Sequence, residues 1–218
     1  MKVGTDAMVL GASLPHAIVG KALDIGTGTG VLALMIAQNN PNLEIIGVEL
    51  DRLAANEAKE NVSNSNFSSQ IEVLQGDYLT YESKFKYDLI VSNPPYFEDS
   101  FKSGIKTKNQ ARHNDSMPLK EFMHKSEGLL NDTGSLWLVY PALRERSLLE
   151  EAKKVGLILV RKIDVFGKSN HLVRVVVELS RTPRELDFKE LTIRNEAGKY
   201  TKDYIALTKE FYAIGCQD

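Results

Sequence analysis

The sequence predicts an α/β fold in which a mostly parallel sheet of seven strands carries helices on both faces. Short apolar runs typical of buried strands alternate with helical segments for roughly 140 residues, a pattern that favours parallel strands joined by crossover helices. The last two strands are joined only by the short link at 166–170. A link this short cannot hold a crossover helix, so the last strand should run antiparallel.

Each element has a local signal. The strands are expected at 21–25, 44–50, 71–75, 87–92, 135–140, 157–165 and 172–179. Helices are expected at 31–38, from 52 to about 61, at 118–130 and at 143–155, with Asp51 as the N-cap of the second. Residues 97–117 are polar and lack periodicity, which predicts a long loop. A short strand at 190–194 and a helix at 201–212 are expected to close the chain.

The chain of 218 residues fits one domain, with a lead-in at 1–20, a catalytic core at 21–181 and a C-terminal extension at 182–218. The hydrophobic fraction of 43% is enough for a sizeable core. The net charge of -2 does not by itself indicate a nucleic-acid partner, so any contact with RNA would have to come from a local patch.

The composition also predicts a cytoplasmic protein that binds no metal. Cys216 is the single cysteine, and the four histidines are scattered without metal-site spacing. The apolar stretch at 7–20 is broken by Gly11 and Pro15 and runs into the first strand, which argues against a signal peptide. No uncharged apolar run reaches the ~20 residues that a membrane helix needs.

A glycine cluster follows the first strand and opens the first helix, in the run Asp24-Ile-Gly26-Thr-Gly28-Thr-Gly30. Glycines there let a ligand approach the backbone, and the helix start offers free N–H groups. A dinucleotide fingerprint would require a third glycine at position 31, where Val31 stands. The spacing instead resembles the first motif of class I S-adenosylmethionine methyltransferases. A tight strand-to-helix turn without a ligand is the alternative.

Acidic residues follow the next two strands. Glu49 suits a bidentate grip on ribose hydroxyls, whereas Asp51 is better explained as a helix cap. Asp77 follows the third strand and could accept a hydrogen bond from an adenine amine, with Tyr78 beside the ring. Ligands of open α/β sheets bind at these carboxyl ends, which favours a common site.

The fourth strand ends in Asn93-Pro94-Pro95-Tyr96. The prolines fix φ and remove two backbone donors, which leaves a rigid turn with exposed carbonyls. The Asn93 side-chain oxygen and the Pro94 carbonyl could accept both hydrogens of a planar NH₂ group, and Tyr96 could stack on its ring. Positioned acceptors of this kind suit methyl transfer to an exocyclic amine. The alternative is a structural stop after a strand.

The motifs DIGTGTG, VELD, GDY and NPPY together resemble amino-methyltransferases acting on adenine N6, guanine N2 or protein glutamine. The segments MKVGTDAMVL at 1–10, ARHNDS at 111–116 and YTKDY near the C-terminus look like the bacterial tRNA-valine adenine-37 N6-methyltransferase family. The resemblance covers essentially the whole chain. It implies a Rossmann-like fold, S-adenosylmethionine as cofactor and tRNA as partner. Family members usually begin with a basic, aromatic segment, so this chain looks short at its start, and tRNA affinity is less firmly implied than cofactor binding.

The resemblance also implies roles for single residues. Thr5 and Asp6 would border the methionine end of the cofactor. The cofactor would be held by Asp24, Gly26, Gly28, Gly30, Glu49 and Asp77, and the target amine by Asn93, Pro94, Pro95 and Tyr96. Arg112 and His113 would lie in a loop that faces RNA.

Basic residues cluster after the NPPY turn, and we expect them to grip phosphates beside the pocket. The expected RNA-binding residues are Lys102, Lys106, Lys108, Arg112 and His113, with Lys120 and Lys125 nearby. A second basic group comprises Arg181, Arg184, Lys189 and Arg194. A solvated surface without a ligand is the alternative for both groups.

Two other functions are open. A protein-glutamine N5-methyltransferase could use the same turn on a carboxamide, but such enzymes usually carry an N-terminal helical domain, for which the lead-in leaves no room. A non-catalytic RNA-binding module with a vestigial cofactor pocket is disfavoured because every expected ligand residue is present. The oligomeric state is open.

Overall fold

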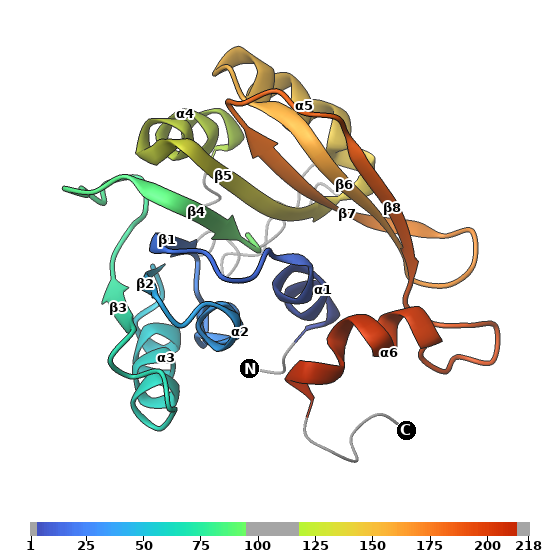
Figure 1. The fold of residues 1–218 in the computed structure, drawn as a ribbon, viewed down its shortest axis with the longest axis horizontal. Helices are drawn as coiled ribbons and strands as arrows, with labels where there is room; N and C mark the ends of the chain where they lie inside the picture. Colours follow the sequence, from blue (N-terminus) through green and yellow to red (C-terminus); the bar gives the residue numbers. More distant parts are fainter. Residues whose placement is uncertain (1–3, 95–117, 213–218) are drawn as a thin grey trace, which may run out of the picture.

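The computed structural model describes residues 4–94 and 118–212 (Figure 1). Its single sheet has the order β3-β2-β1-β4-β5-β7-β6-β8. The strands are β1 (Gly20–Ile25), β2 (Leu43–Glu49), β3 (Ile71–Gln75), β4 (Tyr87–Ser92), β5 (Leu130–Pro141), β6 (Ile158–Phe166), β7 (Leu172–Ser180) and β8 (Asp187–Thr192). Only β7 runs antiparallel to its neighbours, so the predicted mostly parallel sheet with an antiparallel seventh strand is confirmed.

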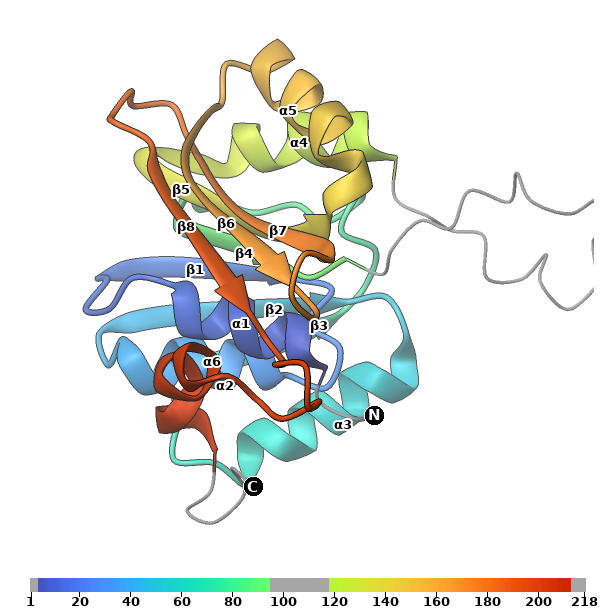
Figure 2. The ribbon, with the colours of Figure 1, turned by 90° about the vertical axis from the view of Figure 1, so that its right-hand side faces the viewer.

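The sheet has eight strands, so the expected number of seven was wrong. The additional strand β8 pairs in parallel with β6 at the sheet edge that faces the viewer in Figure 2. It starts at Asp187, three residues before the short strand that the sequence predicted. Because β8 is an edge strand, Phe188, Lys189 and Glu190 are all exposed, and its sequence lacks the apolar run of a buried strand.

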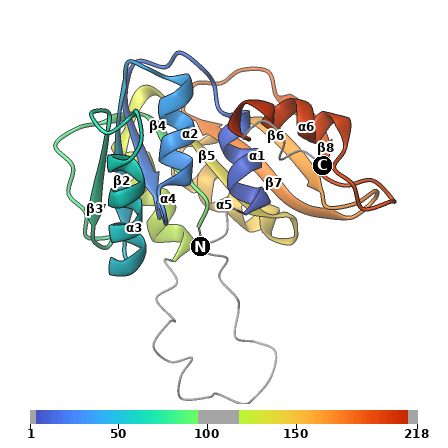
Figure 3. The same cartoon turned by 90° about the horizontal axis from the view of Figure 1, so that it is seen from below.

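Helices cover both faces, as predicted. The helices are α1 (Thr5–Ser13), α2 (Val31–Asn39), α3 (Arg52–Ser63), α4 (Leu119–Leu129), α5 (Glu145–Lys154) and α6 (Lys202–Thr208), with short 3-10 turns η2 (Ala142–Arg144) and η3 (Lys209–Phe211). Figure 3 shows α3, α2, α1 and α6 in one row on one face, and Figure 1 shows α4 and α5 on the other. Helix α1 was not expected, since its apolar residues merge into the stretch around Pro15.

Two apolar clusters lie on the two faces of the sheet. The first joins Leu10 of α1 and Ile36 of α2 to Trp137 of β5, and it includes Tyr204 of α6. The second joins Met123 of α4 and Leu148 of α5 to strand residues such as Leu23 and Tyr87. All of these side chains are almost fully buried. Burial of this extent on both faces fixes the strands and hence the loops at their ends.

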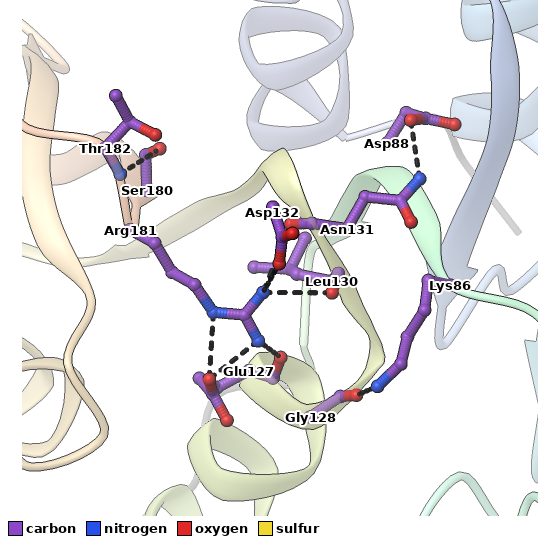
Figure 4. A network of polar contacts seen from close by, with 10 residues as sticks. All are labelled: Lys86, Asp88, Glu127, Gly128, Leu130, Asn131, Asp132, Ser180, Arg181 and Thr182. Carbon is purple, nitrogen blue, oxygen red and sulfur yellow. Dashed lines mark hydrogen bonds and ion pairs between the residues drawn. The ribbon is translucent and has the colours of Figure 1, made fainter.

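Arg181 is the centre of a polar network at the sheet edge where the parallel strands begin (Figure 4). The Arg181 guanidinium donates to the Glu127 carboxylate at 2.7 and 2.9 Å and to the carbonyls of Glu127, Leu130 and Asn131. The Asn131 side chain donates to Asp88, which accepts from the backbone N–H of Lys21. Arg181 therefore connects the end of β7 to α4. This structural role explains why one member of the second basic group is present.

Candidate active site

The strand ends that carry the predicted motifs lie side by side. Ile25 at the end of β1 pairs with Val48 of β2 on one side and with Ser92 of β4 on the other. The residues that follow these three are Gly26, Glu49 and Asn93. Neighbouring strands are about 4.8 Å apart, so the glycine loop starts directly between the acidic strand end and the Asn-Pro corner.

The glycine loop has a backbone that side chains rarely adopt. Gly26, Gly28 and Gly30 have φ values of 69°, 59° and 84°. A side chain at Gly26 would meet no atom within 4 Å, so the loop is open there, whereas one at Gly30 would touch Ala58 of α3 at 3.4 Å. Gly26 therefore suits close approach by a ligand, and Gly30 allows helix α3 to pack against the loop.

Glu49 is bound to the glycine loop. Its Oε2 accepts a hydrogen bond from the Gly28 N–H at 2.8 Å, and its Oε1 accepts from the Asp51 N–H at 2.9 Å. Both oxygens are thereby oriented at the edge of the sheet, as a bidentate grip on a diol requires. Asp51 accepts from the Ala54 N–H at 2.8 Å, which confirms the predicted helix cap.

Asp24 is a buried carboxyl group beside the loop, with 1% of its surface exposed. Its Oδ2 accepts from the Thr27 hydroxyl at 2.6 Å. Burial raises the pKa of Asp24 to about 7, although the Thr27 hydroxyl and the Ala33 N–H favour the charged form, and Glu49 adds to the rise. Within 4–94 and 118–212, Oδ1 has no partner at hydrogen-bond geometry. A buried carboxylate with one unused oxygen fits a cationic ligand group.

Asn93 and Pro94 follow β4 at the same edge. Asn93 is half-buried and Pro94 is buried. The Ser92 hydroxyl donates to the Ile25 carbonyl at 2.8 Å and so ties the end of β4 to the end of β1. This bond fixes the position of the corner relative to the glycine loop. Pro95 and Tyr96 lie outside the described residues.

The two predicted residues that follow β3 lie in different environments. Asp77 is exposed, and its Oδ1 accepts from the Leu79 N–H at 2.8 Å. Tyr78 is only 3% exposed, packs against Phe122, and its hydroxyl lies 2.9 Å from the Ser126 hydroxyl. The structure thus places Tyr78 in the core under α4 and does not bring it together with the other predicted residues at the surface of the site.

The predicted residues of the N-terminal segment lie at the start of α1. Thr5 and Asp6 are half-buried, and Asp6 accepts from Arg174 of β7 at 2.9 Å. Arg174 pairs with Pro141 at the carboxyl end of β5. Asp6 therefore lies at the same sheet edge as the strand-end motifs. The predicted RNA-binding residues Lys102, Lys106, Lys108, Arg112 and His113 lie outside the described residues.

Three residues that position the site were not predicted. Thr27 orients Asp24, Ser92 joins the two strand ends, and the Asn61 amide donates to the Thr29 carbonyl at 2.9 Å. Thr27 and Ser92 lie within or next to predicted motifs, so their position in the sequence could have indicated a role in the site. Asn61 gave none, because it lies on a helix surface more than thirty positions from the loop that it holds.

Comparison with known proteins identifies the family. A family model described as methyltransferase small domain matches residues 2–155. A tRNA1(Val) (adenine(37)-N6)-methyltransferase of Trichodesmium erythraeum is 39% identical over 97% of this chain and 91% of its own length, and one of Bacteroides fragilis is 40% identical over the same shares. The chain belongs to this methyltransferase family.

Solved structures agree on the fold. A predicted O-methyltransferase from Agrobacterium tumefaciens superimposes with a TM-score of 0.73 over 95% of this chain and 97% of its own, at 18% identity. A TehB-like SAM-dependent methyltransferase from Corynebacterium glutamicum superimposes with a TM-score of 0.56 over 83% of this chain and 89% of its own, at 19% identity. The predicted Rossmann-like class I methyltransferase fold is confirmed.

The methyltransferase uses S-adenosylmethionine. The structure is compatible with this cofactor, because the loop at Gly26 is open, Glu49 presents two oriented oxygens, and the buried Oδ1 of Asp24 meets no donor at hydrogen-bond geometry among the described residues. No group of three metal-binding side chains occurs among the residues that the structure describes. In the same part of the chain, every helix is too short or too polar to span a bilayer.

Proposed function

We propose that this methyltransferase transfers a methyl group to the exocyclic N6 amine of an adenine in tRNA, namely adenine 37 of tRNA1(Val). The proposal is supported by relatives known as tRNA1(Val) (adenine(37)-N6)-methyltransferases, which are 34% to 40% identical over 97% of this chain. One structural observation supports it most directly. The Asn93 corner and the open Gly26 loop follow paired residues on adjacent strands, Ser92 and Ile25.

Because the cofactor supplies an activated methyl group, the task of the protein is to position the cofactor and the target amine. S-adenosylmethionine supplies a methyl carbon made electrophilic by a positively charged sulfur. We assign Asp24, Gly26, Gly28, Gly30, Glu49 and Asp77 to binding the cofactor, with Thr5 and Asp6 at its methionine end. Asp24 and the two Glu49 oxygens offer negative charge and oriented acceptors, which suit a cationic ligand that carries a ribose diol.

The target amine is assigned to the corner at Asn93. The Asn93 side-chain oxygen and the Pro94 carbonyl accept the two N–H groups of the adenine amine, which pulls the nitrogen from planarity and concentrates its lone pair. We assign Pro95 to stiffening this turn and Tyr96 to stacking on the base. The bound cofactor would supply the methyl carbon to this nitrogen and would keep the electron pair of the broken carbon–sulfur bond on its sulfur, and the extra proton of the amine would leave to water. Fixed acceptors lower the barrier because they need no reorganisation during the reaction.

We assign Lys102, Lys106, Lys108, Arg112 and His113 to contacts with the RNA around the pocket. A single domain spanning 1–218 would carry both the cofactor site and these contacts. The protein is assigned to the cytoplasm, where the tRNA is. Adenine 37 must leave its stack to reach the corner, as bases do in other enzymes that modify them.

The proposal is tested by transfer of labelled methyl groups to tRNA from cells that lack this gene, followed by nucleoside analysis. We expect the label in N6-methyladenosine of one valine tRNA. Label in protein glutamine would support the rival N5-methyltransferase. A lack of both methyl transfer and cofactor binding, the latter measured by calorimetry, would support a non-catalytic RNA-binding module with a vestigial cofactor pocket. Either result would refute the proposal.

A further inference from the structure

Two hairpins project from the sheet beyond the site and touch each other. The first, at 166–172, joins β6 to β7, and the second, at 193–201, joins β8 to α6. The Ile193 N–H donates to the Phe166 carbonyl at 2.8 Å, and the Arg194 N–H donates to the Gly167 carbonyl at 3.2 Å. Figure 1 shows them one below the other, at the side to which the β4 arrow points. We call this pair the double hairpin.

The register places the double hairpin beyond the Asn93 corner. Ser92 pairs with Leu138 of β5, and Leu138 pairs with Val177 of β7. Val177 in turn pairs with Lys162 of β6, so Ser92 and Lys162 lie at the same level of the sheet. Strand β6 continues from Lys162 to Phe166 and therefore extends about 13 Å past the end of β4 at ~3.3 Å per residue. Three strand spacings of about 4.8 Å separate β4 from β6. The double hairpin thus forms a ledge beside the site.

The ledge is positively charged in a chain whose net charge is -2. Its charged side chains are Lys168, Arg194 and Lys199, against the single carboxylate of Glu196. Lys168 and Lys199 are exposed. Among residues 4–94 and 118–212, no carboxylate lies within ion-pair distance of these three cations. Exposed cations without acidic partners keep their charge available for a polyanion.

Local contacts hold the second hairpin in one shape. The Arg194 guanidinium lies 4.1 Å from the centre of the Tyr200 ring and donates to the Gly198 carbonyl at 2.6 Å. The Tyr200 ring stacks on Tyr204 at 4.7 Å. The Asn195 side chain accepts from the Lys199 N–H at 3.0 Å. An ordered hairpin loses little backbone entropy when it binds a ligand, so the backbone position from which Lys199 extends is preorganised.

The other members of the second basic group, unlike the cations of the ledge, have acidic partners. Arg181 is bound to Glu127, Arg184 to Glu178, and Lys189 lies 3.8 Å from Asp187. These cations are neutralised by carboxylates within the fold, and only Arg194 of this group belongs to the ledge. The sequence grouped them by proximity along the chain, whereas the structure separates them by their partners.

We propose that the double hairpin binds phosphates of the tRNA stem while the target base occupies the Asn93 corner. This inference rests on the proposed function, because it takes tRNA as the substrate. The offset of about 14 Å across the sheet is too large for the target nucleotide itself and suits backbone phosphates farther along the molecule. Lys168 and Lys199 supply sequence-independent contacts that set the orientation of the RNA.

The test compares two double variants. Lys168→Gln/Lys199→Gln removes two charges from the ledge. Lys84→Gln/Lys153→Gln serves as the matched control, because it removes two exposed charges near the opposite sheet edge, one from the loop before β4 and one from the last turn of α5. Binding of full-length valine tRNA is measured by fluorescence anisotropy between 0.05 and 0.4 M salt (about an eightfold range), with cofactor affinity measured by calorimetry.

We expect the ledge variant to lower the steepness of log K against log salt by about 1.4 to 1.8, since each phosphate contact contributes ~0.7–0.9. If affinity at 1 M salt is unchanged, that slope weakens binding roughly 15- to 30-fold at about 0.15 M salt. The control variant should match the wild type, and both variants should bind the cofactor normally.

An equal slope for the ledge variant and the wild type would overturn the proposal while leaving the proposed function intact, provided that the wild type binds and methylates the tRNA. A wild type that methylates no tRNA would overturn both. Equal losses in the ledge and control variants would mean that overall charge, and not the double hairpin, determines binding, and would also overturn the proposal.

Discussion

The buried carboxyl group of Asp24 should make the stability of the free protein depend on pH. Its pKa rises from 3.8 in an exposed carboxyl group to about 7 in the folded protein. The folded state therefore binds the proton more tightly than the unfolded state between these values. It follows that the free energy of unfolding falls as pH rises from about 4 to about 7, and the stabilising contribution is lost above pH 7.

The size of the effect follows from the shift. A change of about 3 pKa units, at 1.36 kcal/mol each, corresponds to about 4 kcal/mol between pH 4 and pH 8. Asp24→Asn cannot ionise, so its stability relative to the wild type should increase with pH by an amount of this order. The hydrogen-bond change at Thr27 adds an offset that is independent of pH.

Urea unfolding of the two proteins at several pH values between about 5 and 8.5 measures this difference. Asp51→Asn is the control, since it replaces an exposed carboxylate by another good helix cap and changes the net charge by the same amount as Asp24→Asn. If the difference between Asp24→Asn and the wild type stays constant across the range, the reasoning about Asp24 is refuted.

Three further predictions follow from the same contacts. Cofactor affinity measured by calorimetry should rise up to about tenfold from pH 6 to 8 in the wild type, because ionised Asp24 attracts a cationic ligand. Asp24→Asn should abolish this rise, and a rise that persists in the variant would contradict the prediction. Glu49→Gln should weaken cofactor binding by roughly tenfold or more, because one charged acceptor is lost. The free energy of unfolding should change by no more than about 1 kcal/mol. Unchanged cofactor affinity would exclude Glu49 from the site. Arg181→Ala should lower the free energy of unfolding by about 2 kcal/mol, as it removes the charged hydrogen bonds to Glu127, and should leave cofactor affinity unchanged; a normal denaturation midpoint would show that the contact is not stabilising.

The sequence predicted the parts of the fold whose signal is local. Apolar runs such as Leu136–Val139 mark buried strands, and Asp51 marks the start of α3. Strand β8 was misplaced and left out of the sheet because an edge strand needs apolar residues on only one face, and Phe188 is itself exposed. Helix α1 was missed because most of it is buried, so it lacks the polar face that reveals a helix.

The candidate site was predictable where chemistry and strand ends coincide, as at Gly26, Glu49 and Asn93. Residues beside a motif were harder to assign, because burial decides their role. Tyr78 follows Asp77 directly but turns into the core, where its hydroxyl meets Ser126. Asn61 acts across the fold on the glycine loop, and no pattern in the sequence links the two. Such contacts depend on tertiary packing, which local sequence does not encode.

The central claim is that the corner at Asn93 acts on the target amine and not on the cofactor. The most direct measurement is the single-turnover rate of methyl transfer to valine tRNA for Asn93→Ala, with cofactor affinity measured on the same sample and Asn131→Ala, on the opposite sheet edge, as control. We predict a rate about 100-fold lower or more, with a cofactor Kd within about twofold of the wild type. A normal rate, or a loss of rate fully explained by weaker cofactor binding, would contradict the claim.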